Sequence, residues 1–195
     1  PPSLTIKKKT QPKPKAKADE FSGYLNTNIS VTQITSATPM TTEGAEHLFH
    51  LKLISDLGER EFCAGIAADY TCEQLVGMKI VSIQNLKPRA MFGITSSAML
   101  LAASTHSEEG GRESIAILTP PADAEVGDRV YPEGHEEILA EDHVLPEVCP
   151  RKQWDRCVAK FGVRNEIATL GGCDLIVKGR GPVQCVGMPD NATIH

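Results

Sequence analysis

The feature that most constrains the fold is a succession of short apolar segments, each of strand length and each closed by a turn. Residues 48–54 (LFHLKLI) alternate apolar and polar side chains with a period of two, which is typical of a strand buried on one face. Asp56-Leu57-Gly58 is a turn signal, and residues 61–67 resume the composition of a strand. The pattern predicts an antiparallel hairpin, and therefore a mainly β fold.

The rest of the N-terminal half continues this pattern, with one helix interposed. Thr71 can cap a short helix over residues 71–76, because Gln74 stands at the position of a capping-box partner. Short strands with a single helix between them favour a small closed barrel. Further strands are predicted at residues 29–34, 79–86 and 114–118, with a fully buried strand at residues 98–103 and a polar loop at residues 105–112.

The C-terminal half predicts a smaller β-rich unit. Trp154, Cys157, Val158 and Phe161 recur at helical spacing, and we interpret Trp154 and Phe161 as core-packing residues. The pair Gly171-Gly172 is typical of a hairpin turn. The predicted strands of this unit lie at residues 167–170, 173–177 and 183–186, and a mobile basic turn, Lys178-Gly179-Arg180-Gly181, separates the last two.

Charge is distributed unevenly along the chain. Residues 21–132 carry seven basic and thirteen acidic residues, and residues 132–150 form an acidic segment with three prolines that predicts an exposed loop. Residues 1–20 interleave lysine with proline and small residues, and therefore predict a disordered basic arm that is either a solvated linker or a phosphate-binding extension. Its lysines are Lys7, Lys8, Lys9, Lys13, Lys15 and Lys17.

Composition and motifs argue against several classes of function. The six cysteines form no CxxC pair, which indicates reduced thiols in a cytoplasmic protein rather than a metal site. No combination of residues supplies a base, a nucleophile and an oxyanion site, so no catalytic residue, metal or cofactor is expected and the chain is predicted not to be an enzyme. The apolar runs are too short to span a membrane.

The most informative block is residues 81–104 (VSIQNLKPRAMFGITSSAMLLAAS), a strand, a basic turn and a serine-rich return. Its Asn-Leu-Lys-Pro at residues 85–88, followed by Gly93, Ser96 and Ala98-Met99, resembles the signature of the tRNA-binding domain family. That family includes synthetase C-terminal appendices and endothelial monocyte-activating polypeptide II. Residues 62–66, 115–130 and 166–188 are similar to further segments of the same family, the last of them in its eukaryotic branch.

The resemblance implies an OB-fold, a five-stranded barrel, with a smaller C-terminal β-rich domain packed on it. We therefore expect a barrel domain at residues 21–105 and a companion domain at residues 106–195. The family grips tRNA by shape, without reading an anticodon, and serves aminoacyl-tRNA synthetases or a multisynthetase complex. The companion domain of such members occupies the surface that bacterial relatives use to dimerise, which implies a monomer.

The resemblance also indicates which residues bind RNA. Ser96 and Met99 match tRNA-contacting positions of the family, and Lys87 and Arg89 lie in the same loop. Phe92 stands where the family has arginine, and either stacks on a base or packs against the protein. The arm lysines, Lys178 and Arg180 complete the predicted RNA-binding set. The acidic barrel leaves an alternative open, a protein–protein scaffold in a synthetase complex with weak residual RNA binding.

Overall fold

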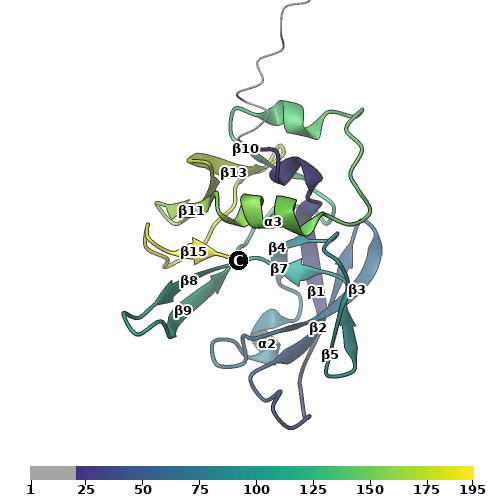
Figure 1. The fold of residues 1–195 in the computed structure, drawn as a ribbon, viewed down its shortest axis with the longest axis vertical. Helices are drawn as coiled ribbons and strands as arrows, with labels where there is room; N and C mark the ends of the chain where they lie inside the picture. The colour runs from purple at the N-terminus through teal and green to yellow at the C-terminus, as the bar shows by residue number, and fades with distance from the viewer. Residues whose placement is uncertain (1–20) are drawn as a thin grey trace, which may run out of the picture.

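The computed structural model describes residues 21–195, which form a mainly β structure (Figure 1). The basic arm predicted at residues 1–20, with its six lysines, lies outside the described residues. Within residues 21–195, no helix is long and apolar enough to cross a membrane. The mainly β architecture predicted from the alternating segments is confirmed.

The N-terminal half folds into a five-stranded antiparallel sheet with the order β3-β2-β1-β4-β7. Alternation holds in the predicted hairpin: Leu51 and Leu53 are fully buried, whereas Lys52 between them is half-buried. The strands are β1 (Ile29–Pro39), β2 (Phe49–Ser55), β3 (Gly58–Ala64), β4 (Lys79–Ile83) and β7 (Met99–Leu100).

Hydrogen bonds between β3 and the segment that precedes β7 nearly close the sheet into a barrel. The backbone N–H of Ser97 donates to the carbonyl oxygen of Glu61 at 3.0 Å, and that of Cys63 donates to Ser96 Oγ at 3.2 Å. The predicted short helix is present as α2 (Cys72–Leu75), and Thr71 and Gln74 form the predicted capping box. The predicted OB-fold is therefore confirmed.

The C-terminal half packs on one face of this barrel. Its main sheet has the order β10-β13-β12-β11, with β14 paired to β13, and a second sheet has the order β15-β8-β9. The strands are β8 (Ala102–His106), β9 (Arg112–Ile117), β10 (Val130–Pro132), β11 (Phe161–Arg164), β12 (Ile167–Leu170), β13 (Cys173–Val177), β14 (Gly181–Pro182) and β15 (Thr193–Ile194). The helices are α3 (Arg151–Val158) and the 3₁₀ turns η1 (Tyr24–Asn26) and η2 (Glu136–Leu139).

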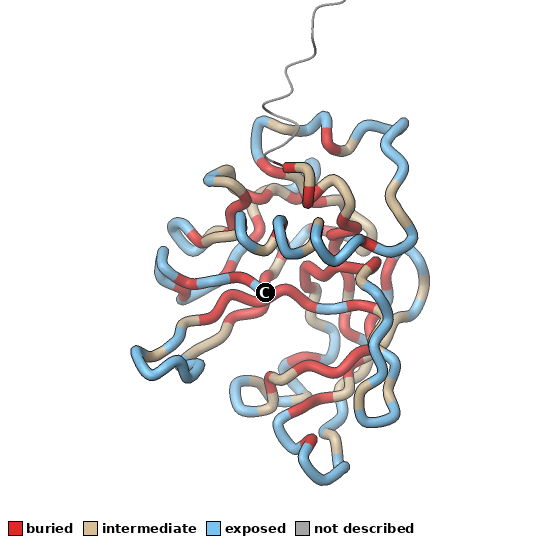
Figure 2. Tube along the Cα trace, in the orientation of Figure 1, coloured by how far each residue is buried: buried red, intermediate tan, exposed pale blue. Residues whose placement is uncertain are grey.

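Two large hydrophobic clusters account for this arrangement. Figure 2 shows the buried segments of both halves in red. One fills the barrel around Leu51 and Phe62, both 0% exposed. The other joins the outer face of β1 and β4, through Val31 and Val81, to Leu175 of the C-terminal sheet. Because strand side chains alternate between faces, the central strands of the barrel contribute to both clusters. Their shared apolar cluster holds the two halves together.

The segment predicted as one buried strand at residues 98–103 is instead two strands, and that prediction is wrong. The N–H of Leu101 still bonds to Val81, but Ala102 already pairs with Ile117. The chain changes partners at Leu101, and β7 leaves Met99 exposed. The predicted polar loop at residues 105–112 is also shorter, because β8 and β9 extend into it and form a hairpin. This hairpin crosses the domain boundary predicted at residue 105, and the division into domains stays a prediction.

Two further predictions near the C-terminus are wrong. Phe161 does not continue the helix: α3 ends at Val158, and Phe161 begins β11, where it pairs with Leu170. The next residue, Gly162, disfavours continuation of the helix. The strand predicted at residues 183–186 is reduced to bridges at Gln184, because the chain leaves the edge of β13 after Val183 and then meets Thr119 and Ile167 at a single residue.

Candidate nucleic-acid interface

The basic loop that carries Lys87 and Arg89 leads into a tight hairpin. Arg89 lies directly opposite Ser96 in the β5–β6 pair, in which β5 is Arg89–Met91 and β6 is Ile94–Ser96. The two turn residues, Phe92 and Gly93, have φ values of 50° and 80°. Positive φ at both turn positions is the conformation that matches the twist of a two-residue hairpin. The turn therefore fixes the register that places Arg89 next to Ser96.

Asn85 anchors the start of this loop. Its Oδ1 accepts a hydrogen bond from the N–H of Asn28 at 2.8 Å, and its Nδ2 donates to the carbonyl oxygens of Asn26 and Pro146 at 2.9 and 3.1 Å. Its own carbonyl oxygen accepts from the N–H of Cys149 at 2.7 Å. One buried side chain thus ties the basic loop to the start of the barrel and to the segment before α3.

The predicted residues Lys87, Arg89, Ser96 and Met99 line one groove with a volume of about 550 Å³. Its opposite wall comes from Arg151, Trp154 and Asp155 of α3, which crosses the junction between the barrel and the C-terminal sheet in Figure 1. The groove therefore joins side chains from both halves of the chain. Lys87, Arg89, Met99 and Arg151 are exposed, whereas Ser96 and Trp154 are half-buried.

The sequence predictions missed two residues of this groove, Arg151 and Trp154. Trp154 packs against the core and against Phe161, with ring centroids 6.2 Å apart, as the core-packing interpretation requires. Trp154 also lines the groove. The available signal was the pairing of a basic residue with an aromatic residue at the start of a helix, which is typical of nucleic-acid surfaces.

Close backbone contact holds α3 against the N-terminal turn. A Cβ on Gly23 would lie 2.5 Å from the carbonyl oxygen of Gln153 and 2.8 Å from the amide nitrogen of Cys157.

Burial strongly raises the pKa of the Cys157 thiol, and it also raises the pKa of the Cys149 thiol, which lines the groove. Both thiols are therefore neutral at physiological pH and are poor nucleophiles.

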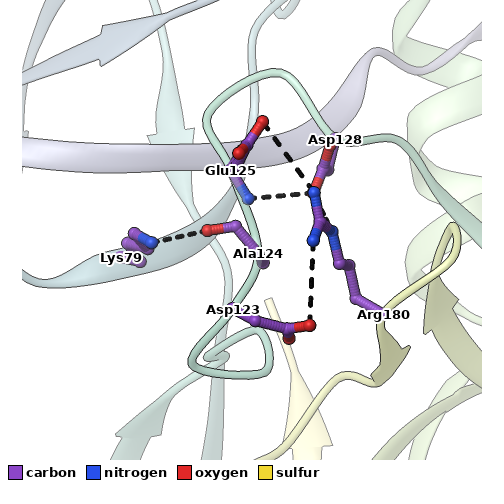
Figure 3. A network of polar contacts seen from close by, with 6 residues as sticks. All are labelled: Lys79, Asp123, Ala124, Glu125, Asp128 and Arg180. Atoms are coloured by element: carbon purple, nitrogen blue, oxygen red, sulfur yellow. Dashed lines mark hydrogen bonds and ion pairs between the residues drawn. The ribbon is translucent and has the colours of Figure 1, made fainter.

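The other predicted residues lie outside the groove lining. Phe92 is 43% exposed at the tip of the β5–β6 hairpin, where its ring is available for stacking. Lys178 is exposed in the turn after β13. Arg180, two residues further on, lies among the carboxylates of Asp123, Glu125 and Asp128, at 3.7, 3.8 and 3.2 Å (Figure 3). Its positive charge is therefore balanced within the protein, and the turn is anchored at this residue.

The groove has the chemistry of a binding surface. Its charged lining residues are the cations Lys87, Arg89 and Arg151 and the anion Asp155, so cations outnumber anions there. Among residues 21–195, no three histidine, cysteine or acidic side chains are placed to hold a metal ion. Cations beside an aromatic ring suit a phosphate backbone and an unstacked base.

An OB-fold with a basic, aromatic groove at its rim defines a class of nucleic-acid-binding proteins. The family described as "Putative tRNA binding domain" matches residues 29–129. The chain belongs to this family, so the resemblance seen in residues 81–104 is confirmed. Membership supports tRNA binding as an auxiliary module, and does not favour the scaffold alternative.

Relatives include aminoacyl-tRNA synthetases. The chain is 42% identical over 104 residues to a methionine–tRNA ligase of Leptospira interrogans, a match that covers 52% of this chain and 13% of the ligase. It is 29% identical over 158 residues to the cytoplasmic tyrosine–tRNA ligase of Xenopus laevis, covering 80% of this chain and 27% of the ligase. The chain thus spans only a minor part of either relative.

A solved structure extends the fold comparison to both halves of the chain. The crystal structure of the C-terminal domain of Plasmodium vivax p43 superimposes with a TM-score of 0.72 and covers 88% of this chain and 98% of that domain. Sequence identity is 20%, so the likeness concerns the fold.

Proposed function

We propose that this chain binds tRNA in the groove between the basic loop and α3, and that it acts as a non-catalytic auxiliary module of aminoacyl-tRNA synthetases in the cytoplasm. The observation that carries the proposal is the single groove that Lys87 and Arg89 line on one wall and Arg151 and Trp154 line on the other. Family membership and the synthetase relatives support the same conclusion. Because contacts to phosphates carry no sequence information, we expect these cations to recognise the shape of the RNA rather than its sequence.

We expect two groups of residues to bind the RNA in different ways, one by fitting its shape and the other by attracting its phosphates. Ser96 Oγ already accepts the N–H of Cys63, so Ser96 positions the hairpin as well as facing the groove. Met99 offers an exposed apolar surface, and Phe92 and Trp154 offer rings for stacking. Lysines 7, 8, 9, 13, 15 and 17, with Lys178, add attraction for phosphates. We expect Arg180 to contribute little, because three carboxylates surround it.

The test is tRNA binding by the full chain and by residues 21–195, measured across salt concentrations. We expect both to bind, the full chain more tightly and with steeper salt dependence, because every neutralised phosphate releases counterions. Equal melting temperatures of the two chains would show that truncation left the fold intact. Absence of tRNA affinity in the full chain at low salt would refute the proposal.

Partner and assembly are tested separately. We expect the chain to sediment as a monomer without RNA, and to raise the occupancy of tRNA on a synthetase to which it is bound or fused. A stable dimer would contradict the monomer prediction and leave the groove proposal intact.

A further inference from the structure

The side of α3 that faces away from the groove carries a row of cations. Lys152, Arg156 and Lys160 are spaced four residues apart and are all exposed, and Figure 2 shows mostly exposed and half-buried positions along this helix. Because side chains four residues apart lie on the same face of an α-helix, the three form one row, which we call the outer stripe. The chain keeps turning after α3 ends at Val158, since the N–H of Lys160 donates to the carbonyl oxygen of Cys157 at 3.0 Å.

A small cavity joins the end of the outer stripe to the start of the described chain. It has a volume of about 180 Å³, and Arg156 and Lys160 line it together with residues 21–24. No aspartate or glutamate is among its described lining residues. Residues 1–20, which contain six lysines, are joined to the described chain at Phe21. The lysine-rich sequence is therefore attached to the fold beside the outer stripe.

Carboxylates do not neutralise the outer stripe. None of the ion pairs within residues 21–195 involves Lys152, Arg156 or Lys160. Residues 151–160 contain four cations and a single anion, Asp155, and this carboxylate lines the groove on the other side of the helix. A polyanion responds to such a local patch of charge rather than to the net charge of the chain.

The two sides of α3 differ in chemistry. The groove side presents Trp154 and the exposed Met99, which suit the face of an unstacked base. The outer stripe presents charge alone, because the exposed residue between Arg156 and Lys160 is Ala159. Double-stranded RNA exposes its phosphates and keeps its bases stacked, whereas unpaired nucleotides expose the faces of their bases. A stem therefore suits the outer stripe, and unpaired nucleotides suit the groove.

From these observations we propose that α3 binds the junction between an RNA stem and the unpaired nucleotides next to it. Phosphates of the stem contact the outer stripe, and the unpaired nucleotides enter the groove on the other side of the helix. The outer stripe spans about 12 Å along the helix axis, which is long enough to contact more than one phosphate. This inference rests on the proposed function, RNA binding in the groove, and names the structural class of RNA that is bound there.

Three RNAs with shared parts test the inference. They are a hairpin with a loop of unpaired nucleotides, a blunt duplex with the stem of that hairpin, and a single strand with the sequence of its loop. Binding of each labelled RNA to the full chain is followed by fluorescence anisotropy at several salt concentrations. We expect the hairpin to bind at least about tenfold more tightly than either of its parts, because contacts on both sides of α3 act together. Equal affinities for the hairpin and for one of its parts would overturn the inference.

A double substitution in the outer stripe tests which part of the RNA lies there. Lys152→Gln with Arg156→Gln removes two cations and keeps side chains that favour a helix. We expect the slope of log K against log salt concentration to fall by about 1.4–1.8 for the hairpin and for the blunt duplex, and to stay unchanged for the single strand. Arg112→Gln with Arg164→Gln is the matched control, because it removes the same charge from two residues that line neither the groove nor the cavity beside α3. The control should leave all three slopes unchanged.

The outcomes separate this inference from the proposed function. If the unmodified chain binds tRNA but the variant of the outer stripe keeps the full slope for the hairpin, the inference alone is overturned, and an acidic protein becomes the better partner for the outer stripe. A fall in slope for the single strand as large as that for the blunt duplex would refute the assignment of the stem to the outer stripe. If the unmodified chain binds no tRNA, the proposed function fails and this inference fails with it. Equal melting temperatures of the variants would show that each of them is folded.

Discussion

Replacing Lys87 and Arg89 together by glutamine tests the groove most directly. Each phosphate that a cation neutralises contributes about 0.7–0.9 to the slope of log K against log salt concentration. The groove presents three cations, Lys87, Arg89 and Arg151, and the double substitution removes two of them. We therefore expect the slope to fall by about 1.4–1.8, whatever residues 1–20 contribute. Between about 50 and 200 mM salt, that slope corresponds to about a tenfold difference in affinity.

The assay is a tRNA titration at several salt concentrations, followed by fluorescence anisotropy of labelled tRNA. Arg164→Gln is the matched control, because Arg164 is 54% exposed, pairs with Asp174 and does not line the groove. Its slope should equal that of the unmodified chain. A double variant that keeps the full slope while folding normally would show that phosphates do not contact this loop.

Three further substitutions or conditions test how the groove is held. Asn85→Ala should lower the free energy of unfolding by about 2–4 kcal/mol in urea denaturation, because three side-chain hydrogen bonds are lost; an unchanged midpoint would contradict this. Gly23→Ala should cost about 1–3 kcal/mol and weaken tRNA binding, since its Cβ would meet Gln153 and Cys157; normal stability would refute the close contact. Burial raises the pKa of Tyr24 and of Cys157, so the folded state favours their neutral forms. Stability should therefore be retained below about pH 9 and fall above it, and an unchanged urea midpoint at about pH 10.5 would exclude this linkage.

Local patterns carried most of the fold prediction. The alternation at residues 48–54, the capping box at Thr71 and the glycine pair at residue 171 each depend on neighbours in sequence, and the structure shows all three features. The wrong predictions concern segments whose secondary structure depends on partners that are distant in sequence. The chain changes sheets at Leu101 because Ile117 offers a new partner to Ala102, and no pattern within residues 98–103 contains that information.

The candidate site divides in the same way. Lys87, Arg89, Ser96 and Met99 lie within one continuous block, so a motif could identify them together. Arg151 and Trp154 complete the groove from α3, more than fifty residues later, and their helix reads as a core helix in sequence. The sequence around Arg180 also gives no sign that its charge is neutralised, because its carboxylate partners lie more than fifty residues earlier in the chain.

The net negative charge of the barrel segment does not by itself oppose RNA binding, because position matters more than the total. Four of the thirteen acidic residues of this segment lie beside an arginine: Asp123, Glu125 and Asp128 surround Arg180, and Asp69 pairs with Arg112. Exposed charges further from a bound phosphate than about 8 Å are largely screened at physiological salt. Within the groove lining, one carboxylate, Asp155, faces three cations. A polyanion at this groove therefore meets a locally positive surface on a chain of net charge −5.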